Sequence, residues 1–429
     1  MPPLVLPMIA TGVSGTAELQ PVTLPRQALL AARRHAEIPL IAGGLLVLLI
    51  FFVHRAWGWN DVILYRSYAS WFWGGPHPFR SLPLEYPPAS ILVFTLALVP
   101  AIRDSATVFA FWMGAAFWLG YFAFLRYRGR ASAALFAAYL LLGGAATLLN
   151  RYDILPALTV VAAIWAATRS RWRLAYVLLA AGVLLKLYPL FLVPLFVIAH
   201  REELASRDWK RKVFRSAWPP AAMVAGGFAA AGAIDFAGTL SPFVYASARP
   251  LQLESVPGSV LWLLSFFGFP ALSDRGFRSF NLVGPLGPGV GSVFSVLMIV
   301  GMAFVYWRYA GGRLSLARAC LAVVCVSIFT NKVFSPQYLI WVLPLVALVD
   351  DRIDALWLAV AGLTTLIYPL LYLADGVLGT PGPFPYGGDL LFTVAVRNVL
   401  FGVATVRAML PERARVSLRE APAVSAAGD

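Results

Sequence analysis

The chain has 429 residues, of which 60% are hydrophobic and 13% are charged, and its net charge at pH 7 is +14. No soluble domain buries that much apolar surface, and apolar runs of about 20 residues, the length that crosses a bilayer, recur along the chain. The lysines and arginines stand in short clusters between these runs, a pattern typical of cytoplasmic loops rather than of a nucleic-acid-binding surface. Composition therefore predicts an all-α, polytopic membrane protein.

We predict one transmembrane domain, residues 38–410, between a cytoplasmic N-terminal segment, 1–37, and a disordered cytoplasmic tail, 411–429. About twelve helices are expected to cross the membrane, since the basic clusters alternate with apolar runs. The clearest spans cover residues 38–56, 107–125, 131–148, 154–167, 214–233, 293–307, 316–330, 339–349, 355–373 and 390–408.

The first external loop is predicted at residues 57–88, and it carries Asp61, the first acidic residue after the chain enters the membrane. Asp61 follows Asn60 at the start of a helical pattern that ends at Gly74, so a helix cap is one role for it and a catalytic base is the other. The next apolar run, residues 90–102, is too short to cross the bilayer. We place that run at the outer interface.

Residues 174–200 form a long apolar run that is interrupted by Lys186 and followed closely by Pro189. Basic clusters flank the run on both sides, which requires an even number of crossings. We therefore predict a hairpin of half-length helices, each of which reaches only about 18 Å into a core about 30 Å thick. Lys186 and Tyr188 would lie at the floor of a depression open to the outside. The alternative is a single kinked span with Lys186 paired internally.

Further charged residues stand at the predicted outer ends of apolar runs, where polar side chains are costly and usually functional. Arg151 and Asp153 share one such end, where a local ion pair or a helix cap is the alternative role. Residues 234–259 form an outward segment, and the Gly/Pro-rich residues 281–291 are predicted to be a loop. The predicted outward cations are Arg66, Arg151, Lys186, Arg249 and Lys332, and the outward carboxylates are Asp61, Glu85, Asp153 and Glu254.

Cations that converge in a hollow of low dielectric suit a phosphate, and in a membrane they favour a phosphorylated lipid head group. Nucleotide sugars are cytoplasmic, so a sugar transfer outside the membrane needs a donor that crosses it, such as a polyprenyl-phosphate sugar. Its leaving group is already a weakly basic phosphate, so one base suffices. Asp61 would take the proton from the acceptor hydroxyl, a step worth a factor of about 10²–10⁴ in rate.

The chain contains four stretches in this order: DVILYRSYASWFWGGPHPFRSLPLEYPP, NRYDILPALTVVAAIWA, GVLLKLYPLFLVPLF and NKVFSPQYLIWVLPL. In their residue types and their order they resemble glycosyltransferase family 87. That family includes polyprenol-phosphate-mannose-dependent α-mannosyltransferases. The resemblance covers residues 61–344 and implies a type-C fold, an inverting reaction and Asp61 as the catalytic base. The expected substrate-binding residues are Arg66, Glu85, Tyr86, Arg151, Asp153, Lys186, Tyr188, Arg249, Glu254, Lys332, Gln337 and Tyr338.

The sequence departs from the wider type-C pattern at two points. Asn60 precedes Asp61 where many type-C enzymes have paired acidic residues, so we predict no metal ion and no other cofactor. Gln337 and Tyr338 follow the Ser-Pro pair, near which some mannose-using relatives have histidine. The expected partners are a polyprenyl-phosphate hexose, with mannose the first candidate, a glycolipid or glycan acceptor and membrane lipids, but no nucleic acid. The expected location is the plasma membrane, with the active site extracytoplasmic.

Two hypotheses from other classes remain, and the number of spans also fits the first of them. A secondary transporter would have broken helices and a buried lysine, but its two halves should repeat, and the second half has no counterpart of the KLYP hairpin. A polymerase or ligase of lipid-linked glycans would have its long external loop late in the chain, unlike residues 57–88.

Overall fold

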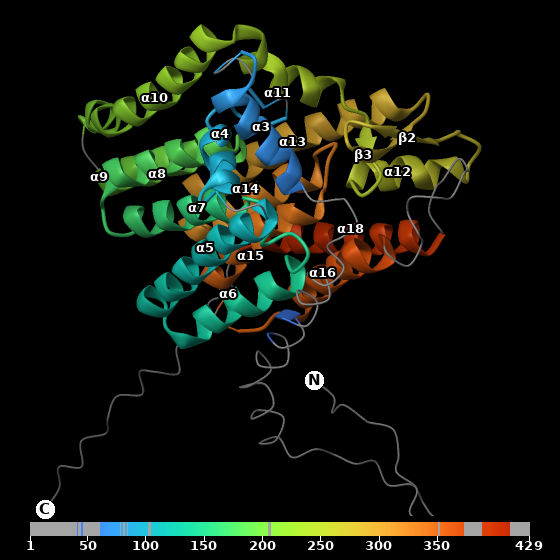
Figure 1. The fold of residues 1–429 in the computed structure, drawn as a ribbon. Helices are drawn as coiled ribbons and strands as arrows, with labels where there is room; N and C mark the ends of the chain where they lie inside the picture. Colours follow the sequence, from blue (N-terminus) through green and yellow to red (C-terminus); the bar gives the residue numbers. More distant parts are fainter. Residues whose placement is uncertain are drawn as a thin grey trace, which may run out of the picture.

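The computed structural model describes residues 41, 44–45, 61–77, 79, 82–83, 85–101, 104–204, 207–350, 352–372 and 388–411. The predicted segment 1–37, most of the predicted first span at 38–56, and the tail beyond residue 411 lie outside these residues. Within them the protein is a bundle of helices with one small sheet at its edge (Figure 1). The predicted all-α membrane fold is confirmed.

The helices differ widely in length, and several are broken by short 3-10 or π segments. In chain order the elements are α3 (Asp61–Gly74), α4 (Ser90–Phe94), η2 (Thr95–Leu98), α5 (Ser105–Tyr127), α6 (Arg130–Gly143), α7 (Ile154–Ala167), α8 (Trp172–Leu185), η3 (Tyr188–Leu192), α9 (Val193–Leu204), α10 (Trp209–Ile234), α11 (Phe236–Ala248), β1 (Leu251–Gln252), α12 (Val256–Ser265), β2 (Leu272–Gly276), β3 (Ser279–Val283), α13 (Gly287–Ala310), α14 (Leu316–Phe329), η4 (Pro336–Tyr338), α15 (Leu339–Val349), α16 (Ala355–Thr365), the π-helical η5 (Leu366–Leu371) and α18 (Gly388–Met409).

Four of the described helices, α5, α10, α13 and α18, are long and apolar enough to cross a membrane. Large apolar side chains such as Phe214 on α10 and Ile299 on α13 are exposed, as expected for surfaces that face lipid. Seven further apolar helices have 10–17 residues, and those at the centre, α14 and α15 above all, are almost entirely buried. The predicted number of about twelve crossings stays a prediction.

The chain doubles back at Lys186, whose backbone is extended (φ −153°, ψ 139°) between α8 and η3. The start of α8 then meets the end of α9, because the Trp172 ring stacks on His200 with centroids 4.5 Å apart. The Tyr176 hydroxyl also donates to the Phe196 carbonyl at 3.3 Å. The predicted hairpin of half-length helices is confirmed, and the single kinked span is wrong.

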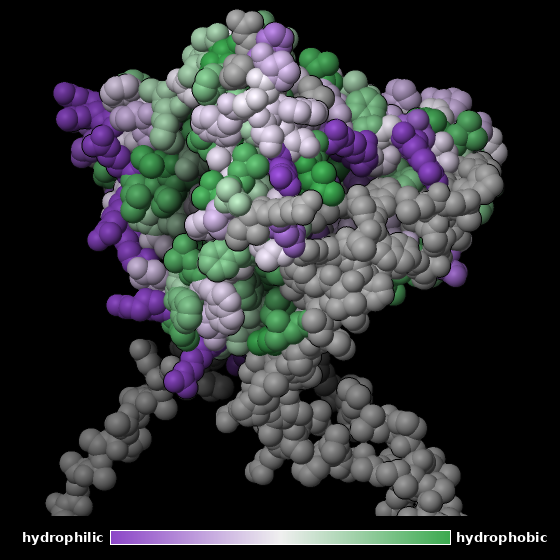
Figure 2. Space-filling view, viewed as in Figure 1, coloured by the Kyte–Doolittle hydropathy of each residue, from purple (hydrophilic) through white to green (hydrophobic). Residues whose placement is uncertain are grey.

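The basic turns gather at one end of the bundle. Arg128, after α5, donates to the Leu348 carbonyl at the end of α15 at 3.0 Å. Arg169, after α7, lies over the Tyr127 ring, and Arg407 of α18 forms an ion pair with Asp354. In Figure 2 hydrophilic residues line the left margin, over the ends of α8, α9 and α10. The charge pattern that suggested a cytoplasmic face therefore corresponds to one physical face.

The short apolar run 90–102 forms α4 and η2, two short segments packed on α3, so it does not cross the bundle as a long helix. The predicted loop at 281–291 is wrong: β3 takes its first residues and α13 begins at Gly287. β3 is the central strand of an antiparallel sheet of order β1-β3-β2. β3 pairs with β2 just before it and with the distant β1, so the local pattern of Gly and Pro did not indicate it.

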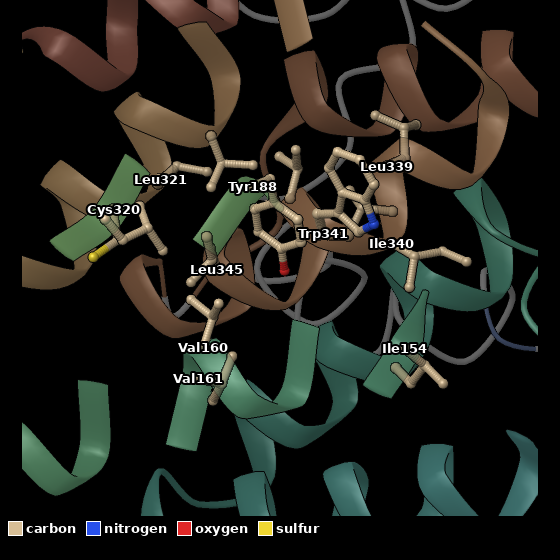
Figure 3. Packing of buried hydrophobic residues seen from close by; sticks show 14 of the residues in the cluster. Ile154, Val160, Val161, Tyr188, Cys320, Leu321, Leu339, Ile340, Trp341 and Leu345 are labelled. Atoms are coloured by element: carbon tan, nitrogen blue, oxygen red, sulfur yellow. The ribbon is translucent and has the colours of Figure 1, made fainter. Parts of the chain in front are cut away.

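The centre of the bundle is a continuous apolar core, part of which Figure 3 shows around Tyr188 and Trp341. Their rings stack with centroids 4.4 Å apart. Residues of α7, such as Val160, and of α14, such as Leu321, pack round this pair. The core thus lies directly behind the segment that follows Lys186.

Gly182, on α8, lies where a Cβ atom would come within 2.6 Å of the Thr159 hydroxyl and 3.1 Å of Pro189. We expect Gly182→Ala to lower the thermal unfolding temperature, because overpacking costs about 1–3 kcal/mol. Gly226→Ala is the control, since a Cβ there meets nothing within 4 Å and alanine favours a helix. Equal unfolding temperatures for the two variants in detergent would contradict the packing described for the hairpin.

Candidate active site

A cavity of about 770 Å³ opens at the end of the bundle opposite the basic turns. Helices α6 and α8 begin near that basic end, and the residues that follow them, Arg151 and Lys186, line the cavity. Lys332, which follows α14, lines it as well, while Arg318 at the start of α14 donates to the carbonyls of Arg407 and Leu410. Irregular backbone after several helices therefore builds the cavity wall.

Four of the five cations expected on this side converge there. Arg151, Lys186, Arg249 and Lys332 line the cavity, and Lys332 donates to the Ser247 carbonyl at 3.2 Å. The fifth cation, Arg66, lies on the exposed face of α3 and does not line the cavity. The hollow is thus strongly cationic.

Asp61 is the first residue of α3, and its carboxylate forms an ion pair with Arg151. The two side chains are 27% and 17% exposed, so the pair is accessible from the cavity. An acid in the first turn also interacts favourably with the helix dipole. Both proposed roles of Asp61, helix start and cavity carboxylate, are therefore compatible with its position.

Lys186 is held at the floor of the cavity by a buried carboxylate. Its Nζ lies 2.6 Å from Asp153 Oδ1, which also accepts a bond from Trp341 Nε1 at 2.7 Å. The ammonium lies 4.7 Å from the centre of the Tyr152 ring and 5.6 Å from that of Tyr86, within the range of cation–π attraction. Asp153 is fully buried, so it lies behind Lys186 and does not line the cavity.

Stacked aromatic rings connect the apolar core to the floor of the cavity. Tyr338 stacks on Trp341 with centroids 4.1 Å apart, on the same ring system that Tyr188 contacts. Tyr338, its neighbour Gln337 and Tyr86 line the cavity, whereas Tyr188 is part of the buried core.

The sequence model of glycosyltransferase family 87 matches residues 84–336, more than half of the chain. The chain belongs to glycosyltransferase family 87. No curated protein matches the sequence. The match includes Arg151, Lys186, Arg249 and Lys332, whereas Asp61 lies before it. This family 87 protein is a glycosyltransferase, which takes a sugar donor and an acceptor, so the transporter hypothesis is set aside.

Two further carboxylates of this family 87 transferase line the cavity. Burial raises the pKa of Glu85, and the nearby cations Arg278 and Arg249 act in the opposite direction. Burial also raises the pKa of Glu254, against the hydrogen bond from Tyr372 and the charges of Arg397 and Arg249. Arg249 therefore lies close enough to influence both carboxylates.

The tip of the β2–β3 hairpin was not predicted from the sequence. It brings Arg275, Phe277 and Arg278 to the cavity of the transferase. Phe277 and Arg278 have φ of 54° and 52°, a left-handed conformation that a sequence without Gly or Asn at the turn does not suggest. Tyr245 fixes this tip by donating to the Phe277 carbonyl at 2.6 Å. Arg278 reaches Glu85 at 3.7 Å.

Tyr368, Tyr372 and Arg397 were not predicted from the sequence either. Two signals could have drawn attention to them: Pro369 within an apolar run, and Arg397 near the middle of the apolar residues 390–408, whose other arginine, Arg407, stands at the end. Among the described residues of the transferase, no group of three or more His, Cys, Asp or Glu side chains could hold a metal ion.

We expect Asp153→Asn to destabilise the protein strongly, because it leaves the buried ammonium of Lys186 without its counter-charge. Breaking one partner of such a pair costs about 3–5 kcal/mol. Adding Lys186→Met to Asp153→Asn removes the uncompensated charge and should recover part of the thermal unfolding temperature. A double variant less stable than Asp153→Asn alone would argue against this pairing.

Proposed function

We propose that this protein transfers a hexose, with mannose the first candidate, from a polyprenyl-phosphate sugar to a hydroxyl of a glycan or glycolipid. The reaction would take place on the extracytoplasmic face of the plasma membrane and invert the anomeric centre. The observation that carries the proposal is the ion pair of Asp61 and Arg151 inside a cavity that Lys186, Arg249 and Lys332 also line.

The cations support a donor with a phosphate group. Lys186 offers a point charge at the floor, while Arg249 offers a planar fork that matches phosphate oxygens. In a cavity lined largely by protein the attraction is stronger than in water. These groups would bind the donor and stabilise the phosphate that leaves.

The reaction needs one proton acceptor. Asp61 would take the proton of the acceptor hydroxyl as that oxygen attacks the anomeric carbon from the face opposite the phosphate. The bond from the anomeric carbon to the phosphate oxygen breaks, and polyprenyl phosphate leaves with the electron pair. Attack from the opposite face inverts the configuration. Arg151 would fix the direction in which the Asp61 carboxylate points.

The charge distribution supports an extracytoplasmic active site. The basic turns lie at the end of the bundle away from the cavity, and basic clusters normally stay cytoplasmic. The cavity would then face outward, where nucleotide sugars are not supplied. Glu85, Tyr86, Gln337 and Tyr338 line the same cavity and would contact the bound sugar or phosphate.

We expect Asp61→Asn to lower the turnover number for sugar transfer by about 10²–10⁴-fold, the usual contribution of a general base. Its binding of polyprenyl-phosphate mannose should change far less, because the cations remain. The matched control is Glu202→Gln, an exposed carboxyl at the end of α9, outside the cavity. Unchanged turnover in Asp61→Asn would remove this residue from the mechanism.

Lys332→Gln should raise the Michaelis constant for the polyprenyl-phosphate donor by about 10-fold or more, since a hydrogen bond to a charged group contributes about 1.5–3 kcal/mol. The constant for the acceptor should stay the same. Lys210→Gln, at the basic end of the bundle, serves as the control. Equal donor constants for wild type and Lys332→Gln would exclude Lys332 from the phosphate site.

A further inference from the structure

Glu254 has a buried carboxylate oxygen that lacks a hydrogen-bond donor in the described part of the chain. It lines the cavity but is only 3% exposed. Its Oε1 accepts a hydrogen bond from the Tyr372 hydroxyl. Its Oε2 is buried and has no partner among the described residues. A buried acceptor without a partner costs about 1–3 kcal/mol, and more when it is charged. Such a group in a cavity wall points to a ligand that supplies the missing donor.

Several hydrogen bonds fix the backbone around Glu254. The Glu254 carbonyl accepts hydrogen bonds from Arg397 Nη2 at 2.7 Å and from Asn398 Nδ2 at 3.2 Å. On the preceding side, Gln252 binds the chain after α14 through its own N–H, which donates to the Lys332 carbonyl at 2.8 Å. On the following side, Ser255 caps α12. Contacts with α18, with the chain after α14 and at the start of α12 therefore hold the backbone that carries this carboxylate.

Of the residues that hold this backbone, Arg397 is the one whose burial costs the most free energy. Its side chain is fully buried within α18, and its guanidinium lies 3.7 Å from the centre of the Phe334 ring. A charged residue in an apolar helix is rare unless it has a function. Arg397 does not line the cavity, so it acts on the site through the Glu254 carbonyl, to which it donates, and through its charge near the Glu254 carboxylate.

Two tyrosines flank the carboxylate. Tyr368 and Tyr372 both line the cavity, and their rings lie 5.4 Å apart at 84°. The helical path breaks at Tyr368 (φ −131°, ψ 117°) within the π-helical segment η5. Such a break is expected where the next residue is a proline, here Pro369, which disfavours helical backbone at the residue before it. The break separates the backbone of Tyr368 from the regular helix α16, beside the carboxylate's hydrogen-bond partner Tyr372.

We propose that Glu254, Tyr368 and Tyr372 form the subsite that recognises the sugar ring, with Glu254 accepting hydrogen bonds from ring hydroxyls and the tyrosine rings packing on its apolar face. The inference rests on the proposed transferase function and adds the residues that choose the sugar. Arg397 is a positioning residue that holds Glu254 through its backbone.

The chemistry of the subsite favours a hydroxyl donor over a phosphate. A carboxylate is an acceptor only, so it pairs with sugar hydroxyls and repels a phosphate. The phosphate would instead lie towards Lys186. The ammonium group of Lys186 pairs with Asp153 on the side away from the cavity. Tyr368, Tyr372 and Arg397 lie beyond residues 84–336, so part of the subsite comes from outside the matched family region.

The test compares equilibrium binding of polyprenyl phosphate and polyprenyl-phosphate mannose, of one chain length, to wild type and E254Q. We expect E254Q to bind the mannose conjugate about 10- to 100-fold more weakly, the value of a hydrogen bond to a charged group, and polyprenyl phosphate as wild type does. That result assigns the donor's sugar to the subsite. Unchanged donor binding with a raised Michaelis constant for the acceptor assigns the acceptor's sugar instead. If both constants match those of wild type, the inference is wrong.

E202Q, which removes an exposed carboxylate of the same type from α9, should change none of these constants.

If E254Q does not fold, Tyr372→Phe provides the second variant, since it removes the donor to Oε1 and should weaken binding of the sugar conjugate alone. Arg397→Lys should also change the ratio of the two affinities, whereas a merely structural role would lower only thermal stability. If wild type binds both lipids equally and transfers no sugar, the proposed function itself is wrong. If wild type is active and the constants of E254Q equal those of wild type, only this inference is wrong.

Discussion

The ion pair of Lys186 with Asp153 is the contact round which the helix ends of this protein are arranged. An ammonium in an apolar surrounding is stable only beside a counter-charge, so the break in the hairpin and the start of α7 must meet. Asp153 also accepts a bond from Trp341, which brings the start of α15 to the same point. The cavity forms where these three segments converge.

The same constraint explains why the irregular backbone gathers on one side. Backbone groups without helical partners are tolerated at membrane depth only where they line a cavity or are covered by protein. The break after α8, the turn before α7 and the chain after α14 all meet this condition, since each contributes lining residues. The long helices α10 and α13 instead present apolar side chains outward. The cavity is therefore formed at one end of the bundle.

The parts of the fold that local pattern determines were predictable. Residues 154–167 and 339–349 are apolar runs with polar ends, and they became α7 and α15 with the same boundaries. The hairpin followed from one lysine between two basic clusters. The β-sheet could not be predicted in this way. Leu251 and Gln252 of β1 pair with the distant Leu282 and Asn281, and β2 pairs with β3 across a turn, Phe277-Arg278, that has no Gly or Asn. Arg66 shows a related limit: five residues after Asp61 on a helix, it points about 140° away from it.

Helix α18 contacts both ends of the molecule. Arg397 binds the Glu254 carbonyl beside the cavity, and Arg407, ten residues later, pairs with Asp354 among the basic turns. At 1.5 Å per residue the two anchors are about 15 Å apart on one stiff rod. A sliding or tilting of α18 would move both anchors together, so the cavity wall at Glu254 and the end of the bundle with the basic turns are mechanically linked.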